Sequence, residues 1–309
     1  GTVAIGLTCC DLRTAHASQP MASVTHVDQG RHRRIELRVG QDAFAEIYAY
    51  GAHVSQFYTH TKRNPILFMS KNAVLDTTKP IRGGIPIIFP QFGPKGPLPS
   101  HGFARTSLWA VDSEQTTPDS AEVTFKLDSN AETKKIWPHE FSSLYTVKLK
   151  DDHLQCTWQI NNPSNEPLSF TCALHSYFNI SQIRDVTLED FTDLDYIDTA
   201  DKGKLCKSDR SAIKIEGEVD RIYIKAPNHI KINDKDGVIH IYKDASLPDA
   251  VVWNPDVVKA SSMSDLGAEE FTKMVCVEPG FVNNVVVIPP GGKYSTTVVF
   301  YKEYLDSKL

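Results

Sequence analysis

Two arginines bound a stretch of the chain that contains no acidic residue. The segment RGGIPIIFPQFGPKGPLPSHGFAR runs from Arg82 to Arg105 and is rich in proline and glycine. Proline restricts the backbone and glycine permits tight turns, so the side chains between them can be held in defined positions. Arginine is suited to bidentate binding of phosphate or carboxylate. A shared anionic ligand is one interpretation. Pairing of each arginine with a carboxylate distant in sequence is the other, because the chain has 38 acidic residues.

A histidine and two carboxylates lie beside strand-like runs. His175 follows an apolar run in FTCALHSYFNIS, and an imidazole that titrates near neutrality suits proton transfer, although a hydrogen-bonded core residue is the ordinary interpretation. Glu278 ends an apolar run in MVCVEPGFVNN, where a buried carboxylate is costly without a partner or a function. A salt bridge to one of the arginines is its ordinary interpretation. Asp220 and Arg221 open the strand in EVDRIYIKAP, and solvent-facing positions would explain both.

Short alternating runs predict the strands that position these residues. RRIELRV places Ile35, Leu37 and Val39 on one face, and AEVTFKL, SSLYTVKL, LQCTWQI, GVIHIYK, NVVVIP and YSTTVVFY show the same two-residue period. SNAETKKIWP predicts one short helix that ends at Pro138, and PDVVKASSMSDLGAEEF predicts another that is interrupted near Gly267. Many strands with few helices predict an all-β fold, a single large antiparallel β-sandwich over residues 31–306.

Composition excludes several classes of protein. The chain has no phosphate-binding glycine loop, dinucleotide-binding GxGxxG, HExxH or GxSxG motif, which argues against ATP, NAD, zinc-protease and α/β-hydrolase chemistry. A net charge of −5 without a dense basic tract argues against nucleic acid, and no apolar run approaches the roughly 20 residues that span a membrane. The cysteines Cys156, Cys172 and Cys276 sit in strand-like runs and form no CxxC pair, which is typical of buried reduced thiols.

The two ends of the chain carry different expectations. Residues 1–30 lack periodicity and are expected to be a tail, either a leader or an added segment, with Met21 as a candidate natural start. Ser307, Lys308 and Leu309 match the tripeptide that the peroxisomal import receptor reads, with chance as the alternative. This address predicts a peroxisome-like organelle such as a glycosome, with the cytoplasm as a further location.

Several segments together resemble a known family. LHSYFNIS is similar to the HSYFN stretch of the aldose 1-epimerases, also called galactose mutarotases. RGGIPIIFPQFG, LPSHGFART, VDRIY, VVWNP and VCVEPG resemble the hexose-6-phosphate mutarotase branch, the glucose-6-phosphate 1-epimerases. The matching segments lie between about residues 80 and 280 and follow the order of the family. The resemblance implies a galactose mutarotase-like supersandwich and an isomerase that interconverts the α and β anomers of hexose 6-phosphates.

The resemblance also implies roles for particular residues. His175 corresponds to the general acid and Glu278 to the general base, and the reaction needs no metal or cofactor. We expect a protonated His175 and an ionised Glu278, which exchange protons with the ring oxygen and the C1 hydroxyl. The implied substrate-binding residues are Arg82, Arg105, Asp220, His101 and Ser100. On this interpretation the two arginines lack acidic neighbours because their partner is the 6-phosphate.

Three other functions remain open at the level of sequence. A mutarotase for neutral sugars such as galactose is the first, and the two arginines argue against it. A catalytically silent sugar-phosphate-binding sandwich is the second, and the His175 and Glu278 pair argues against that. A glycoside hydrolase with two carboxylates is the third, although Asp220 is the one candidate partner for Glu278. We expect the protein to act as a monomer on a small hexose 6-phosphate.

Overall fold

The chain forms strands along most of its length. The computed structural model describes residues 22–28, 32–59, 64–94, 96–209 and 212–305. Within these ranges the elements are, in chain order, β1 (Ser23–Val27), β2 (Arg34–Val39), β3 (Ala43–Tyr48), β4 (His53–Tyr58), β5 (Ile87–Ile88), η1 (Ala104–Thr106), β6 (Ala110–Thr117), β7 (Ser120–Asp128), α1 (Ala131–Ile136), β8 (Ser142–Lys150), β9 (His153–Asn161), β10 (Leu168–Leu174), β11 (Tyr177–Asn179), β12 (Thr187–Glu189), β13 (Asp195–Asp198), β14 (Lys204–Lys207), β15 (Ile213–Lys214), β16 (Val219–Tyr223), β17 (His229–Asp234), β18 (Gly237–Lys243), β19 (Asp249–Asn254), α2 (Asp256–Ser261), η2 (Glu270–Lys273), β20 (Met274–Ile288) and β21 (Lys293–Tyr304).

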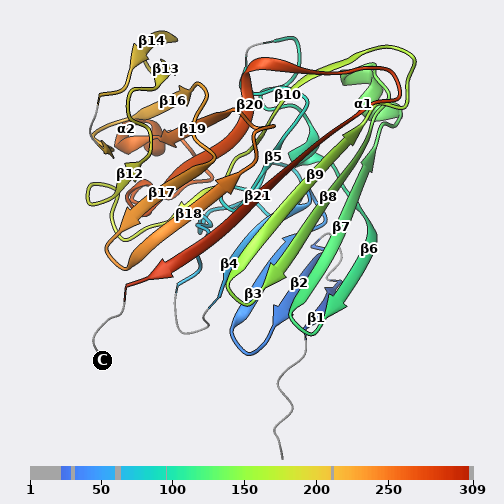
Figure 1. Ribbon diagram of the computed structural model, residues 1–309, viewed down its shortest axis with the longest axis horizontal. Helices are drawn as coiled ribbons and strands as arrows, with labels where there is room; N and C mark the ends of the chain where they lie inside the picture. The colour runs from blue at the N-terminus through green and yellow to red at the C-terminus, as the bar shows by residue number, and fades with distance from the viewer. Residues whose placement is uncertain (1–21, 29–31, 60–63, 95, 210–211, 306–309) are drawn as a thin grey trace, which may run out of the picture.

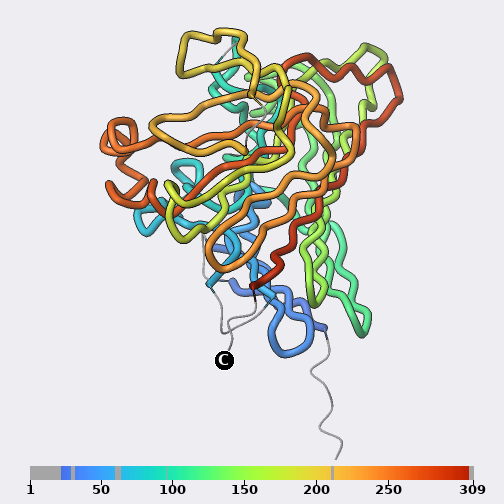
Figure 2. The backbone as a smooth tube through the Cα atoms, turned by 60° about the vertical axis from the view of Figure 1, so that its left-hand side comes forward, coloured from blue at the N-terminus to red at the C-terminus, as the bar shows by residue number. Residues whose placement is uncertain are grey.

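The strands of the described ranges pair into three antiparallel sheets (Figure 1). One has the order β1-β2-β3-β4, and the largest has the order β15-β12-β17-β18-β21-β9-β8-β7-β6. The third has the order β14-β13-β16-β19-β20-β10-β5, and β11 pairs with β20. In Figure 1 the four-stranded sheet lies behind the β6–β9 end of the largest sheet, and in Figure 2 it lies to the left of that end, where β2 and β3 contact β7 and β8. The prediction of an all-β antiparallel sandwich is confirmed.

Alternating burial produces the shared core. Tyr145, Val147 and Leu149 of β8 point inward, as do the alternate residues of β9. Burying such side chains contributes roughly 25 cal/mol per Å² of apolar surface removed from water. Phe89 lies in the acid-free segment and makes edge-to-face contacts with the core aromatics Phe103, Trp137, Phe141, Trp158 and Phe170. The segment between the two arginines is therefore anchored in the core.

The predicted helices are present, and both are short. Asn130 caps α1, because its side chain accepts hydrogen bonds from the backbone of Glu132 and Thr133, and the helix ends before Pro138. The second predicted segment contains α2 and the start of η2, with Gly267 between them. Among the described residues no helix has the length and apolar character needed to cross a membrane.

Two sequence expectations are wrong. β1 lies within residues 1–30, which we expected to be a tail, and it pairs with β2 as an edge strand too short for its alternation to be recognised. The expected end of a strand at Glu278 is also absent, because β20 continues through Pro279 and Gly280 to Ile288. The register with β10 shifts just beyond this point, and Asp249 accepts hydrogen bonds from the backbone of Val282 and Asn283. These bonds satisfy backbone groups that an uninterrupted ladder would otherwise pair.

Candidate active site

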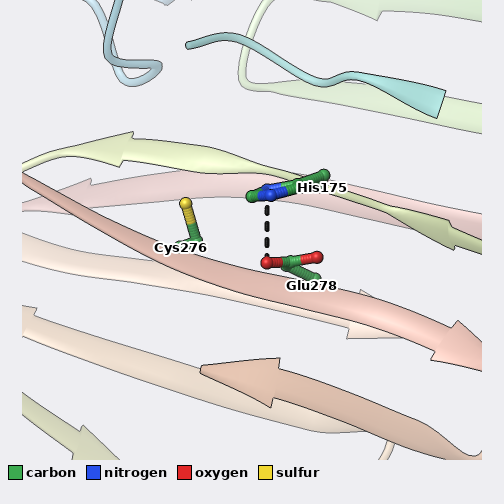
Figure 3. Close-up of side chains that lie close together, drawn as sticks. All are labelled: His175, Cys276 and Glu278. Carbon is green, nitrogen blue, oxygen red and sulfur yellow. Dashed lines mark ion pairs between the residues drawn. The ribbon is translucent and has the colours of Figure 1, made fainter. Parts of the chain in front are cut away.

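His175 and Glu278 face one another at the centre of the β10–β20–β19 region. His175 follows β10 directly, and Glu278 lies in β20, which pairs with both β10 and β11. The Nδ1 atom of His175 lies 3.2 Å from Oε1 of Glu278 (Figure 3). The relative exposures of the two residues are 7% and 1%. The structure therefore brings the two predicted acid–base residues together in a buried pair.

The pair leaves polar atoms unused. Nδ1 of His175 and Oε2 of Glu278 are both buried and have no hydrogen-bond partner within the described part of the chain. Figure 3 shows the imidazole nearly edge-on, with the carboxylate below its face rather than in the ring plane, so the 3.2 Å approach is a close contact and not a hydrogen bond. The ring of Tyr177 stacks on His175, with centroids 4.7 Å apart and planes 7° apart. Buried polar atoms without partners are costly, which favours a ligand that supplies them.

Burial controls the protonation of the pair. Burial lowers the pKa of His175 well below its usual value, and His101, Arg105 and Arg82 lower it further. Burial raises the pKa of Glu278 well above its usual value, with a further rise from Asp220 and an opposing effect from Arg105. The empty site therefore favours a neutral imidazole and a protonated carboxyl. The expected imidazolium and carboxylate differ from this form only in which of the two groups holds the single titratable proton.

Arg105 has N–H donors that are not used in hydrogen bonds within the described part of the chain. Its Nη2 donates to the carbonyl oxygen of Ser100 at 3.0 Å, and its buried Nε has no hydrogen-bond partner. No carboxylate of the described ranges forms an ion pair with it. Burial, together with the neighbouring Arg82, lowers the pKa of Arg105 to about 10, so the guanidinium still carries its charge at neutral pH. Arg105 therefore has the properties expected of an anion-binding residue.

Arg82 already has partners. Its Nη2 and Nε lie 3.0 and 3.2 Å from Oδ2 of Asp265, and its Nη1 donates to the hydroxyl of Tyr177 at 2.9 Å. Burial disfavours the charge, but Tyr177 and Asp265 outweigh it and raise the pKa of Arg82 above its usual value. For Arg82 the structure therefore shows the alternative interpretation, pairing with a carboxylate distant in sequence. Asp265 lies 183 residues away in the chain, which no local pattern reveals.

His101 lies between the acid-free segment and the pair. Its ring is 5.7 Å from that of His175, and its Nδ1 accepts a hydrogen bond of 3.3 Å from the backbone of Gly93. Burial and the charges of the two arginines lower the pKa of His101 to about 3, so the ring is neutral and Nε2 carries its hydrogen. Gly102 has a φ of +67°, and a Cβ there would lie 2.1 Å from the carbonyl oxygen of Phe89. Glycine is therefore required for the turn that presents His101.

The other two predicted residues differ in position. Asp220 lies on β16 and lines the same cleft, and burial raises its pKa. Ser100 is exposed and is absent from the cleft lining, and its carbonyl oxygen holds Arg105 in place. The structure thus gives Ser100 an indirect role at most, through its backbone.

One cleft of about 580 Å³ is lined by all of the predicted site residues except Ser100. This volume is typical of a small-molecule site. Residues of the lining that the sequence reasoning did not single out include Phe92, Thr171, Trp253, Lys259 and Asn283. Trp253 lies in the VVWNP segment and packs edge-on against His175 with centroids 5.9 Å apart, so that motif was an available signal. Phe92 lies in RGGIPIIFPQFG, and Thr171 and Asn283 lie in FTCALHSYFNIS and MVCVEPGFVNN, so these stretches also contained the signal, whereas Lys259 lies outside every family segment.

The arrangement supports proton transfer beside an anion-binding group. A hydroxyl or ring oxygen placed between His175 and Glu278 could lose a proton to one and gain a proton from the other. Arg105 could hold an anionic group of the same molecule. Cys276 adjoins the pair, and its sulfur, the imidazole and the carboxylate could together hold a metal ion.

Comparison with known proteins identifies relatives along most of the chain. The family model described as Aldose 1-epimerase matches residues 33–301. A protein of Cenchrus ciliaris named "Putative glucose-6-phosphate 1-epimerase" is 36% identical over 285 residues, which cover 89% of this chain and 86% of that protein. An Escherichia coli K12 protein of the same name is 30% identical over 237 residues, or 75% of this chain and 78% of that protein.

Solved structures show the same fold. A Salmonella typhimurium crystal structure titled as a "putative mutarotase" has a TM-score of 0.83 and 25% identity, covering 93% of this chain and 97% of that one. A galactose mutarotase-like protein of Clostridium acetobutylicum has a TM-score of 0.72 at 18% identity, covering 92% and 99%, which supports the fold alone.

Proposed function

Because this chain belongs to the aldose 1-epimerase family, we propose that its cleft interconverts the α and β anomers of a hexose 6-phosphate, with glucose 6-phosphate as a substrate. The protein is an isomerase of the mutarotase type. The observation that carries the proposal is the buried His175–Glu278 pair, 3.2 Å apart, in the same cleft as a guanidinium with unused donors.

The reaction needs one proton removed and one delivered. Glu278 takes the proton of the C1 hydroxyl while His175 gives a proton to the ring oxygen. The bond between C1 and the ring oxygen breaks, its electron pair stays on that oxygen, and C1 becomes an aldehyde. Rotation about the C1–C2 bond presents the other face of the aldehyde. Closure then reverses both proton transfers and releases the other anomer with no net change in the enzyme.

Substrate charge helps to prepare the pair. In the empty protein the positive charges of Arg105 and Arg82 disfavour a protonated His175. A bound phosphate offsets these charges, so the single proton of the pair can move from Glu278 to His175. That redistribution produces the acid and base forms that ring opening requires. Each proton transfer is expected to contribute about 10²–10⁴-fold to the rate.

We assign the 6-phosphate chiefly to Arg105. Its Nε and remaining Nη donors have no protein partner to displace, whereas Arg82 would have to share its donors with Asp265. Lys259 lines the same cleft and pairs with Glu218 at 2.8 Å, so its charge is already partly balanced. Asp220 and His101 are left to contact the sugar hydroxyls.

Exchange between anomers tests the proposal directly. Magnetisation exchange between the α and β anomers of glucose 6-phosphate should accelerate when the protein is added, well beyond the exchange of glucose under the same conditions. Equal acceleration of both sugars would favour a neutral-sugar mutarotase. No acceleration of either, together with retained binding of glucose 6-phosphate, would favour a silent binding protein.

Location and assembly are separate proposals. Ser307, Lys308 and Leu309 lie outside the described residues. We propose that they direct the protein through the peroxisomal import receptor to a peroxisome-like organelle. Removing the three residues should abolish organelle staining, and unchanged staining would refute the address. We also propose a monomer, because the cleft is complete within one chain. Light scattering at micromolar concentration tests this.

A further inference from the structure

Cys276 lies beside the acid–base pair and has no part in the proposed reaction. It precedes Glu278 by two residues on β20, so the two side chains lie on the same side of the strand. Ligand atoms of His175, Cys276 and Glu278 all lie within 4.8 Å of one another. Figure 3 shows the thiol and the imidazole above the same stretch of β20. Within the described residues no other group of three histidine, cysteine or acidic side chains is so placed.

We propose that His175, Cys276 and Glu278 form a binding site for Zn²⁺, and that Zn²⁺ bound there blocks the cleft. A nitrogen, a sulfur and a carboxylate oxygen are ligands that zinc accepts together. With zinc–ligand bonds of about 2.0–2.3 Å and tetrahedral angles, ligand atoms lie about 3.3–3.7 Å apart. The Nδ1–Oε1 separation of 3.2 Å is close to this spacing, but the carboxylate lies below the ring face, so the imidazole must turn to point Nδ1 at the metal. The three ligand atoms lie within 4.8 Å of one another, so side-chain rotation must also bring the sulfur closer.

The ligand atoms are available to a metal. Nδ1 of His175 and Oε2 of Glu278 are buried without a hydrogen-bond partner among the described residues. Cys276 is a free thiol that is fully buried in a cluster with Tyr177 and Trp253. His175 and Glu278 line the cleft and Cys276 does not, so a cation enters from the cleft and meets the sulfur at its base.

Nearby charges set the strength of the site. The negative charge of Asp220 near Glu278 attracts a cation. The positive charges of Arg105 near Glu278 and of Arg82 near Cys276 repel one. The two arginines should make the site weaker than a structural zinc site, in which no such charges oppose the metal. Reversible inhibition, rather than permanent occupancy, is therefore expected.

Inhibition follows from the atoms that the metal occupies. The imidazole and carboxylate that would bind the sugar are then committed to the cation, so Zn²⁺ and substrate exclude one another. This consequence depends on the proposed function. Binding of the metal itself does not, because it depends on the three ligands alone.

Cobalt provides a test that is independent of activity. The metal-free chain, with Cys9 and Cys10 replaced by serine to remove thiols outside the described residues, is titrated with Co²⁺. A thiolate–Co²⁺ charge-transfer band in the near ultraviolet should appear, and Zn²⁺ should abolish it. Cys276→Ser should lack the band. Cys172→Ser, which alters a buried cysteine on neighbouring β10, should retain it.

Kinetics provide the second readout. Zn²⁺ should inhibit anomer exchange by the parent chain and by Cys172→Ser, whereas Cys276→Ser should need about 10- to 100-fold more Zn²⁺. Metal-free activity of Cys276→Ser should stay within about twofold of the parent, since sulfur makes no contact in the reaction. Glucose 6-phosphate should also displace Co²⁺ from the parent chain.

Three results would overturn the site. The first is the absence of a charge-transfer band in the folded parent chain. The second is a band that persists in Cys276→Ser. The third is equal inhibition of the parent chain and of Cys276→Ser by Zn²⁺. If circular dichroism shows that Cys276→Ser is unfolded, Cys276→Ala replaces it, and the band of the parent still decides whether a thiolate binds the metal. Failure of the proposed function has a different signature, since it shows as no anomer exchange in the metal-free parent.

Discussion

Nδ1 of His175 lies 3.2 Å from Oε1 of Glu278, at the base of a cleft that also contains the guanidinium of Arg105. Oε2 of Glu278 and Nε of Arg105 are buried and lack hydrogen-bond partners in the part of the chain that the structure describes. The site therefore has an acid–base pair and a cationic donor that are both unsatisfied without a ligand. Each prediction below tests one part of this arrangement, with EDTA present to exclude metal ions.

Glu278→Gln should separate catalysis from binding. Glutamine has the shape of the protonated carboxyl that the empty site favours, so the fold and the cleft should be preserved. Anomer exchange of glucose 6-phosphate should fall about 10²–10⁴-fold because the base is lost. Calorimetric affinity for glucose 6-phosphate should change little. Glu166→Gln, at an exposed position, is the control, and wild-type rates in Glu278→Gln would support a silent binding protein.

The same substitution should change how stability depends on pH. The folded pKa of Glu278 is raised, so folded protein holds a proton that unfolded protein releases above its ordinary pKa. This contribution to stability is fully present below the unfolded pKa and is lost as pH rises through the folded pKa. Glutamine cannot ionise, so Glu278→Gln should gain stability relative to wild type between pH 5 and pH 8. Thermal unfolding measures this, and a constant difference across that range would contradict the raised pKa.

Arg105→Ala should remove the preference for a phosphorylated sugar. A hydrogen bond to a charged group contributes about 1.5–3 kcal/mol, so KM for glucose 6-phosphate should rise roughly 10- to 150-fold. Exchange of glucose should be almost unchanged, since it has no phosphate to lose. Arg38→Ala, an exposed arginine on β2, controls for general loss of positive charge. An equal effect on both sugars would show that Arg105 does not read the phosphate.

Arg82→Ala should damage the architecture as well as binding. The change leaves Asp265 without its cation and removes the hydrogen bond to the Tyr177 hydroxyl. Because the Tyr177 ring stacks on His175, a change in Tyr177 also affects the acid–base pair. The pair is partly buried, with side-chain exposures of 22% and 14%, so the loss should lie between the roughly 0–1 kcal/mol of a surface pair and the about 3–5 kcal/mol of a fully buried one. Unfolding by denaturant should show a loss of stability in Arg82→Ala and a smaller one when Asp265→Asn is added. Additive losses would show that the Arg82–Asp265 contact has no energetic role.

The pH dependence of kcat/KM should lack an ordinary histidine limb. Burial lowers the pKa of His175 well below 6.5, so the pair gains a second proton only at more acidic pH. The pair loses its single proton at the raised pKa of Glu278, which sets the alkaline limb. The substrate phosphate loses its second proton at about pH 6, as other phosphate monoesters do. The measured rates are therefore corrected for the fraction of substrate in each ionic form. A residual limb at pH 6.5 would show that His175 is not held neutral.

Much of the fold could be predicted because strands show a local alternation of apolar and polar residues. Ile35, Leu37 and Val39 are buried as the two-residue period predicts, and α1 ends before Pro138 because proline cannot continue a helix. The motifs also identified His175 and Glu278, and the structure places both in one pair. The strand through Pro279 was missed, since the side-chain bonds from Asp249 that support it come from another strand.

The sequence by itself determined most of the strands, the acid-free segment and the residue types available for proton transfer, because these depend on neighbours along the chain. The tertiary structure alone decided how those residues are charged and paired. Asp265 reaches Arg82 across 183 residues, and Cys276 joins His175 through strand pairing. The neutral state of His175 and the protonated state of Glu278 follow from removal of water around both groups. Burial depends on packing among all the sheets, and no short stretch of sequence contains that information.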